Sequence, residues 1–347
     1  MKKTLAALIV TAFAASAANA AVVYDNEGTK VELNGSLRLI MEKADKKEYD
    51  AANHSTKKSN SALRNAGSRF GITVKHNLDN DFYALGRVEF RFDDTTSRDK
   101  FGGVYAKRAY VGLGSKAIGE LKFGRQLTIA DDLTQANDYD YGFIPKEEYI
   151  PTAGTGVVRY DYKGIEGLQL SANYNFGQTN DEKGNPLKPG IKNAYAVGAL
   201  YTVGDLDARL AYGHTNFETG ASYAHRLDGV LASLGYKFGD FTLTGDFAYG
   251  HEKFDDEKTN KFYVAPGFAY QVLPASKVYG NYLYERVKGE NTKDKTHGFL
   301  LGADYQLHKQ VVVFLEGKYV TTKSYVNDAY DGKVKDRAIG VGMRVFF

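Results

Sequence analysis

Seven histidines are the residues in this sequence best suited to metal binding or proton transfer, and their spacing supports neither role. They are scattered along the chain, without the short-spaced pairs that metal motifs require. The sequence also contains no Walker-type glycine-rich loop and no Gly-x-Ser-x-Gly elbow. A serine, a histidine and an acid from distant segments could still converge without a local motif, so an enzyme remains an alternative. The histidines are His54, His76, His214, His225, His251, His297 and His308.

A series of basic residues could act electrostatically on a solute. These residues stand at the same alternate positions of their segments as the neighbouring polar side chains. When each segment is aligned as a β-strand, these residues point away from the apolar face. An arginine or lysine that faces lipid at the membrane midplane costs about 2–4 kcal/mol, so a membrane protein would turn them inward. The series comprises Arg38, Arg69, Lys75, Arg87, Arg91, Arg108 and Arg159.

Acidic residues gather in residues 127–155, the longest well-defined segment without alternation, which also holds Pro145 and Pro151. Loops longer than about 12–15 residues are usually functional or disordered. If this loop folds inward, its carboxylates face the basic series across a narrow gap, and the resulting transverse field orients water and dipolar solutes. If it lies on the cell surface, its acids are merely solvated, and the spacing alone leaves both arrangements open. The acids are Asp131, Asp132, Asp138, Asp140, Glu147 and Glu148.

The elements that must position these residues are β-strands, because apolar and polar residues alternate with a period of two from end to end. Residues 167–176 are typical: Leu168, Leu170 and Ala172 share one face with the aromatics that follow, while Gln169 and Ser171 share the other. The same pattern recurs at 31–41, 241–249, 298–307 and 339–347. Three segments fit it poorly, at 104–113, 261–271 and 277–287.

The connections between these strands fall into two alternating classes. Seven are short and eight are long and polar, which makes fifteen connections and predicts sixteen strands. An even number of strands, with short turns at one rim and long loops at the other, is typical of bacterial outer-membrane barrels. The short turns lie at 78–81, 115–119, 163–167, 203–205, 238–240, 273–276 and 307–310. The long connections lie near 43–67, 94–103, 127–155, 178–190, 214–226, 254–261, 288–296 and 323–336.

Composition places the chain outside the cytoplasm and away from nucleic acid. Lys2 and Lys3, a short apolar run and Ala18-Asn19-Ala20 predict a signal peptide over residues 1–20, cleaved to leave residues 21–347; a retained anchor is the alternative. Without the two lysines the formal charge falls from +3 to +1, with no basic excess for nucleic acid. The chain has no cysteine, so stability must come from something other than disulfides, such as a closed sheet.

A soluble β-sandwich would also alternate apolar and polar residues, but about 330 residues exceed a usual single sandwich domain. Apart from the signal peptide, no window approaches 18 consecutive apolar residues. If the mature protein lives in a membrane, it must therefore do so as a barrel, since only helices and closed barrels satisfy their backbone in lipid.

Short motifs along the whole mature length resemble the general diffusion porins of Gram-negative outer membranes. Residues 31–35 (VELNG), 68–71 (SRFG) and 108–113 (RAYVGL) match the first, second and fourth strands of that family. Residues 123–125 (FGR) precede the third long loop, residues 159–161 (RYD) follow it, and Phe347 ends the chain. Each motif is weak alone, but their order and spacing together are specific to the family.

The resemblance implies a sixteen-stranded antiparallel transmembrane β-barrel with short periplasmic turns, long extracellular loops and an inward-folded third loop. It also implies a homotrimer in outer-membrane lipid and lipopolysaccharide that passes small hydrophilic solutes and ions, without cofactor, metal or catalysis. Where family members often carry Pro followed by Glu at the loop tip, this chain has Pro145 and then Lys146, so the carboxylates that line the gap are unassigned. A solute-specific channel is the alternative. By position, Arg69 and Arg108 resemble the wall arginines of the family, and Phe347 is the implied assembly signal. With the parity of the strands, we expect the basic wall of the constriction to consist of Arg38, Arg69, Arg87, Arg108 and Arg159.

Overall fold

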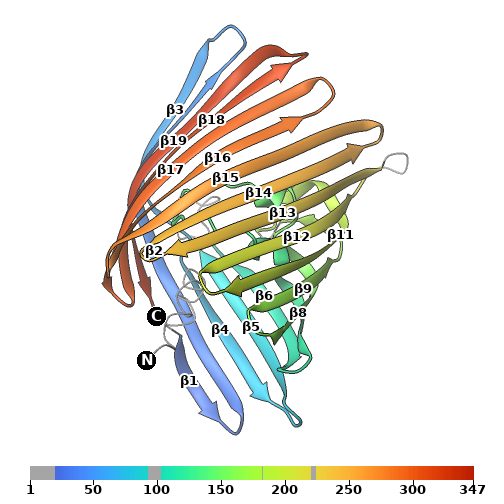
Figure 1. The fold of residues 1–347 in the computed structure, drawn as a ribbon, viewed down its shortest axis with the longest axis vertical. Coiled ribbons are helices and arrows are strands. Elements are labelled where there is room, and N and C mark those ends of the chain that lie inside the picture. Colours follow the sequence, from blue (N-terminus) through green and yellow to red (C-terminus); the bar gives the residue numbers. More distant parts are fainter. Residues whose placement is uncertain (1–19, 93–102, 182, 220–223) are drawn as a thin grey trace.

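The protein is a β-barrel, shown here as a computed structural model that describes residues 20–92, 103–181, 183–219 and 224–347 (Figure 1). The expected signal peptide lies outside the described residues except for Ala20, and so does most of the expected connection at 94–103. Regular structure in the described part consists of strands and two short 3₁₀ helices. No helix in those ranges has the length and hydropathy to cross a membrane.

Within the described residues, nineteen strand elements occupy sixteen positions around the barrel, as the alternation predicted. Three pairs of elements each share one position. β3 and β4 both pair with β2, and β9 and β10 both pair with β11. β1 continues the line of β19, because both pair with the same side of β2. The elements are β1 (Ala21–Asn26), β2 (Thr29–Tyr49), β3 (Ser55–Asn65), β4 (Arg69–Asn77), β5 (Phe82–Phe92), β6 (Val104–Ser115), β7 (Gly119–Leu127), β8 (Ala153–Ile165), β9 (Leu168–Asn175), β10 (Gln178–Asn180), β11 (Pro186–Val203), β12 (Leu206–Phe217), β13 (His225–Phe238), β14 (Phe241–Phe254), β15 (Glu257–Leu273), β16 (Ser276–Lys288), β17 (Thr292–His308), β18 (Val311–Val326) and β19 (Ala329–Phe346).

The sheet closes where the last strand meets the first long one. β19 pairs antiparallel with β2 from Lys333–Tyr49 down to Phe346–Ser36. Below that point Phe347 exchanges both backbone hydrogen bonds with Gly35, at 2.8 and 3.1 Å, and β1 then pairs with the remainder of β2. A closed sheet leaves no free edge, which satisfies the backbone without disulfides.

The outer face is apolar and the inner face is polar or small, as a barrel in lipid requires. On β2 the outward residues Leu37, Leu39 and Met41 are 52%, 38% and 63% exposed. The neighbours that alternate with them point into the lumen and include Ser36 and Arg38. Exposed large apolar residues continue this band on all the remaining strands from β3 to β19, except the short β10, and except β16, whose outward apolar side chains are only partly exposed.

Connections confirm the two rims, but many of the long segments are paired strand rather than open loop. All seven short turns lie where the sequence predicted them. At the other rim, β14 and β15 are separated by residues 255–256 alone and β18 and β19 by residues 327–328. A strand of polar residues can extend beyond the membrane, because pairing between strands requires only backbone hydrogen bonds. A polar composition therefore does not show where a strand ends.

Two segments with poor alternation have local irregularities in the ladder. Between β5 and β6 the register shifts so that Glu89 opposes Arg108 and Phe90 opposes Ala106, which leaves Lys107 as an extra residue in a β-bulge. In β15 the pairing with β16 is interrupted at Ala265 and Pro266, since proline has no N–H to donate. Both segments are nevertheless strands of the barrel.

Candidate functional site

The segment between β7 and β8, residues 128–152, lies inside the barrel, and we call it the third loop. It contains the helices η1 (Ile129–Asp132) and η2 (Lys146–Glu148). Loop residues form a buried cluster with inward side chains of β11 to β16: Ile129, Ala130, Leu133, Tyr149 and Ile150 lie against Ala196, Ala211, Leu231, Ala248, Tyr263, Ala265 and Leu283. The loop therefore narrows the lumen.

Small residues on the inner wall make room for this loop. A Cβ added to Gly213 would lie 2.5 Å from Cγ2 of Ile150, and one added to Gly229 would lie 2.2 Å from the backbone oxygen of Tyr149. Gly198 is in similar contact with Ile129, at 2.8 Å. Because real Cβ atoms do not approach other atoms so closely, larger side chains at these positions would displace the loop.

Carboxylates of the wall hold the loop by accepting its backbone N–H groups. Asp246 of β14 accepts from Gln135 N at 3.0 Å and Ala136 N at 3.2 Å. Glu316 of β18, which is completely buried, accepts from the N–H groups of residues 139, 140 and 141 at 2.7, 2.9 and 2.6 Å, and from the hydroxyl of Tyr279 at 2.8 Å. These charge-assisted bonds satisfy backbone groups that no strand pairs.

Aromatic stacking and a cation also fix the far end of the loop. The ring of Tyr139 stacks on Phe314 with centroids 4.5 Å apart, and the guanidinium of Arg344 lies 4.6 Å from the Tyr139 centroid. Tyr139 also donates its hydroxyl to Asp304 at 2.7 Å. The loop thus extends along the inner wall from β8 to β19, with contacts at several points along its course.

Five arginines face the lumen from β2, β4, β5 and β6. We call this group the arginine wall: Arg38, Arg69, Arg87, Arg91 and Arg108. Arg69 lies directly opposite Arg91 in the ladder, and Arg38 lies opposite Arg344. Like charges placed opposite each other destabilise a sheet, so this cluster stores electrostatic repulsion.

One acid, Glu89 of β5, offsets part of that repulsion. Its carboxylate lies 2.9 Å from Arg91, 3.1 Å from Arg87 and 3.8 Å from Arg69, and it opposes Arg108 in the ladder. Arg38 is held differently, because its Nε donates to Ser36 at 2.7 Å. The wall therefore keeps a net positive charge with its guanidinium groups in fixed places.

Charges of the third loop act on this wall across the lumen. The negative charge of Asp131 attracts Lys107 and Arg108. Asp138 reaches the lumen but lies deep inside the barrel; this burial, together with repulsion by Glu316, raises the pKa of Asp138 to about 6 against the opposing pull of Arg344 and Lys146. An acidic loop opposite a basic wall produces a field perpendicular to the pore axis.

Comparison with known proteins agrees with this geometry. A family model described as Gram-negative porin matches residues 4–325. The chain belongs to the Gram-negative porins. A major outer membrane protein of Pasteurella multocida strain Pm70 is 32% identical over 379 aligned positions that cover both chains completely. A second major outer membrane protein of Pasteurella multocida is 30% identical over 369 positions, again with complete coverage.

Solved structures share the fold of this porin at lower sequence identity. An anion-selective porin from Comamonas acidovorans is 20% identical, with a TM-score of 0.67, 92% of this chain and all of that chain covered. The trimer form of OmpT from Vibrio cholerae is 18% identical, with a TM-score of 0.69 and the same coverage. The family match and the two Pasteurella multocida relatives show that this porin is an outer-membrane protein and a diffusion channel.

The structure brings most of the predicted basic residues together. Arg38, Arg69, Arg87 and Arg108 belong to the arginine wall, as does Arg91. Arg159 lies apart from it, at the start of the third loop, where it bonds Asp132 at 2.6 Å and Asp161 at 3.0 Å and donates to the backbone oxygen of Thr128 at 2.9 Å. Lys75 is also outside the wall, with its ammonium 3.8 Å from the ring of Tyr83.

The predicted acids of the porin divide into two groups. Three have cationic partners nearby: Asp132 bonds Arg159, Asp140 bonds Arg64, and Asp131 lies 3.3 Å from Lys146. Asp138, Glu147 and Glu148 are exposed, and no cation among the described residues lies within ion-pair distance of them. The Glu148 carboxylate reaches the water of the lumen but is surrounded by the barrel wall; this partial desolvation first, and then repulsion by Glu147 and Glu252, which Lys261 opposes, raises its pKa.

Residues that sequence reasoning missed are those that hold the loop and balance the wall: Glu89, Asp246, Glu316 and Arg344. All four share the inward parity of their strands, so the alternation could have placed them in the lumen. Nothing in their local sequence marks them further, since their partners lie on segments distant in the chain. The histidines take ordinary polar partners, and the described ranges hold no group of three potential ligands for a metal ion.

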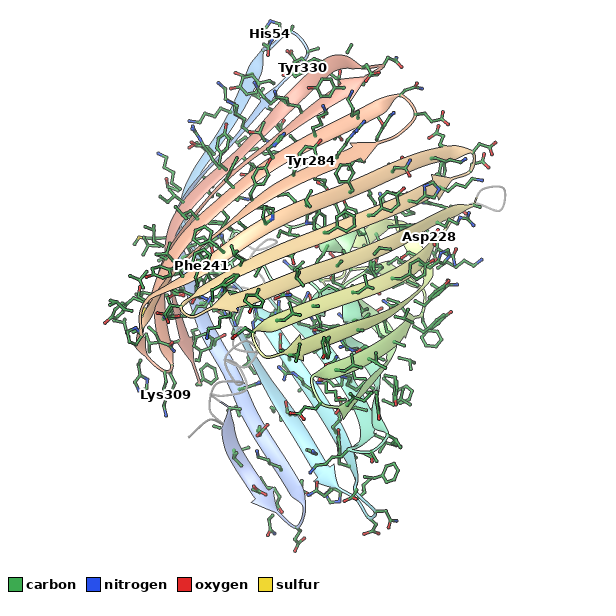
Figure 2. The ribbon with its side chains drawn as sticks, viewed as in Figure 1. His54, Asp228, Phe241, Tyr284, Lys309 and Tyr330 are labelled. Carbon is green, nitrogen blue, oxygen red and sulfur yellow. The ribbon has the colours of Figure 1, made fainter. Side chains whose placement is uncertain are left out.

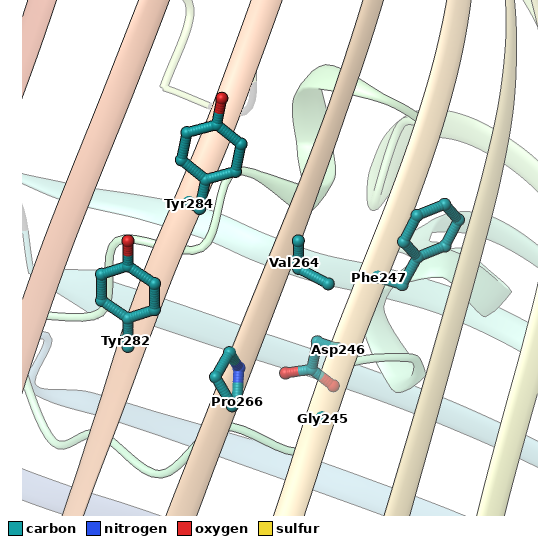
Figure 3. Close-up of a pocket in the computed structure, with 7 residues that line it drawn as sticks. All are labelled: Gly245, Asp246, Phe247, Val264, Pro266, Tyr282 and Tyr284. Atoms are coloured by element: carbon teal, nitrogen blue, oxygen red, sulfur yellow. The ribbon is translucent and has the colours of Figure 1, made fainter.

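Hollows on the outer wall are separate from this site. One has a volume of about 480 Å³ and is lined by outward residues of β14, β15 and β16, among them Phe247, Val264 and Tyr284 (Figure 3). Pro266 and Gly245 produce the depression there, because neither extends a long side chain outward. Such apolar dents face the lipid.

Proposed function

We propose that this diffusion channel passes small hydrophilic solutes and ions through an eyelet between the arginine wall and the exposed acids of the third loop. The observation that carries the proposal is the anchoring of the loop inside the barrel by Asp246 and Glu316, opposite the wall. The eyelet limits solute size, and its transverse field favours polar solutes over apolar ones.

We further propose that the porin acts as a homotrimer in outer-membrane lipid and lipopolysaccharide, and that transport involves no covalent chemistry. The trimer form of the Vibrio cholerae relative supports the assembly by analogy of fold. The aromatic ring of Phe347 lies over Gly35 at the closing seam, which supports the terminal residue as the signal read during assembly. Chemical cross-linking of the purified porin tests the trimer, and a single species of monomer mass would contradict it.

Planar-bilayer recording of purified porin tests the channel. We expect large stepwise currents that do not saturate with added sugar or nucleotide. Saturable block by one solute would instead favour a solute-specific channel, and hydrolysis of a lipid or peptide substrate without conductance would favour an enzyme.

The eyelet assignment is tested by neutralising Arg69 and Arg108 together with glutamine. We expect the reversal potential in a salt gradient to shift toward cation selectivity, because the fixed positive charge opposite the loop is reduced. Arg337, which lies on the outside of β19 and is 57% exposed, supplies the matched control R337Q. An unchanged reversal potential in the double variant, or an equal shift in the control, would contradict the placement.

A further inference from the structure

The third loop contains a single cation, Lys146, and its ammonium group turns back onto the loop. The Nζ of Lys146 donates to the backbone oxygen of Asp131 at 2.6 Å and to the hydroxyl of Thr134 at 3.2 Å, and it lies 3.3 Å from Oδ1 of Asp131. Only 17% of the Lys146 side chain and 20% of the Asp131 side chain are exposed. Residues 131–134 therefore supply an acceptor for each of the three hydrogens that an ammonium group can donate.

The two segments that this contact joins are each held in place by other groups. In η1, Ile129 is completely buried against the barrel, and Arg209 of β12 donates to a backbone oxygen of η1 at 2.7 Å. Directly after η2, Tyr149 is also completely buried. Because the backbone on both sides has these independent contacts, loss of the Lys146 ammonium group would free the Asp131 side chain without releasing the loop.

Asp131 has a second source of attraction, which lies on β6. Its negative charge attracts Lys107, the extra residue of the β-bulge, and Arg108 of the arginine wall. A carboxylate side chain can turn between its few staggered rotamers while the backbone stays in place. Lys146 and the basic residues of β6 therefore compete for the same carboxylate.

We propose that Lys146 is a positioning residue for ion selection, because it holds the Asp131 carboxylate against the third loop and away from the arginine wall. With the ammonium group in place, the charge of Asp131 is neutralised within the loop, and the wall keeps its positive charge for ions in transit. Without it, the carboxylate turns toward Lys107 and Arg108 and cancels part of that charge. This inference rests on the proposed eyelet and adds a determinant of ion preference on the side of the loop.

Reversal potentials of the purified full-length porin in a potassium chloride gradient test the proposal. A cleft lined by charge of one sign raises the local concentration of counter-ions about tenfold or more, so K146M should lower the ratio of chloride to potassium permeability at least about twofold. Methionine keeps the apolar stem of the side chain and removes the charge. K146R keeps the charge and should retain most of the ratio. The shift should shrink in about 1 M salt, where the Debye length is about 3 Å.

The deciding comparison is D131N in the wild-type and K146M backgrounds. In K146M it removes a carboxylate that has turned toward the wall, so it should raise the permeability ratio back to the wild-type value. In wild type it should raise the ratio less, because Lys146 already neutralises that charge. The matched acid is Asp138, which Lys146 attracts from beyond ion-pair distance, so D138N should shift the ratio equally in both backgrounds. Equal shifts by D131N in the two backgrounds would show that Lys146 acts through its own charge alone, and would overturn the proposal.

Lys309, exposed at the short turn between β17 and β18, supplies a charge-matched control (Figure 2). K309M should keep the wild-type ratio, and a shift equal to that of K146M would overturn the proposal. Heat-modifiable migration in a gel checks that each variant forms the barrel. A K146M shift that persists in concentrated salt would indicate a displaced loop and also contradict the inference. If R69Q/R108Q changes the reversal potential and K146M does not, this inference fails while the eyelet stands; if neither changes it, the eyelet fails as well.

Discussion

Substitution of Glu316 by glutamine should release the tip of the third loop while leaving the barrel intact. The carboxylate accepts three backbone N–H groups of the loop and the hydroxyl of Tyr279. A glutamine keeps one acceptor oxygen but turns an NH₂ donor toward N–H groups that also donate. At about 1.5–3 kcal/mol for each hydrogen bond to a charged group, loss of one bond and weakening of the others costs the anchor about 2–4 kcal/mol.

That cost shifts the ratio of anchored to detached loop by about thirtyfold or more. The apolar contacts of Ile129 and Ile150 and the bonds to Asp246 remain, so only the tip should move. Barrel closure does not depend on these bonds, and heat-modifiable migration in a gel should be unchanged.

Single-channel recording and liposome swelling with sugars of increasing mass measure the effect. We expect more current flicker, a higher mean conductance and faster entry of larger sugars in E316Q. The matched control is E48Q, because Glu48 is an inward carboxylate near the rim that forms an ion pair with Lys46 at 2.8 Å. Conductance and sugar exclusion identical to wild type in E316Q would refute the anchoring argument, as would an equal change in E48Q.

Other predictions concern pH, the loop seat and assembly. Asp138 is charged above its pKa of about 6 and neutral below it, so lowering the pH from 7 to 5 should shift selectivity toward anions, and D138N should lose this shift in reversal-potential measurements. Gly229→Ala places a Cβ against the backbone of Tyr149 and should weaken loop seating by about 1–3 kcal/mol, seen as altered conductance with normal barrel folding. Phe347→Ala removes the ring over Gly35 and should reduce the yield of heat-modifiable barrel in the outer membrane, whereas unchanged yield would leave the residue without an assembly role.

Local pattern predicted the fold of this porin well because a transmembrane barrel is built from repeated short-range rules. Alternation alone placed the strands, and the seven short turns defined one rim. The failures of the pattern at Lys107 and Pro266 mark a bulge and a break in pairing, which depend on the neighbouring strand. The extent of strand pairing at the long rim was also beyond the pattern, since polar residues extend strands and form loops equally well.

The sequence predicted the site residues whose inward direction follows from the alternation along a strand. It did not predict the residues whose role depends on contacts with segments distant in the chain. Arg38, Arg69, Arg87 and Arg108 point into the lumen because their strands alternate. Arg159 has the same parity but bonds the start of the third loop, because Asp132 lies beside it only after the loop turns inward.

The sequence by itself determined that the chain forms an antiparallel barrel with a basic inner face, because lipid outside and water inside impose a period of two on every strand. Only the tertiary structure decided which acids reach the lumen and what holds the third loop there. Those properties arise where residues of β14 and β18 meet the loop more than a hundred positions away in the chain. No local spacing encodes such contacts, because closure of the sheet is what brings the partners together.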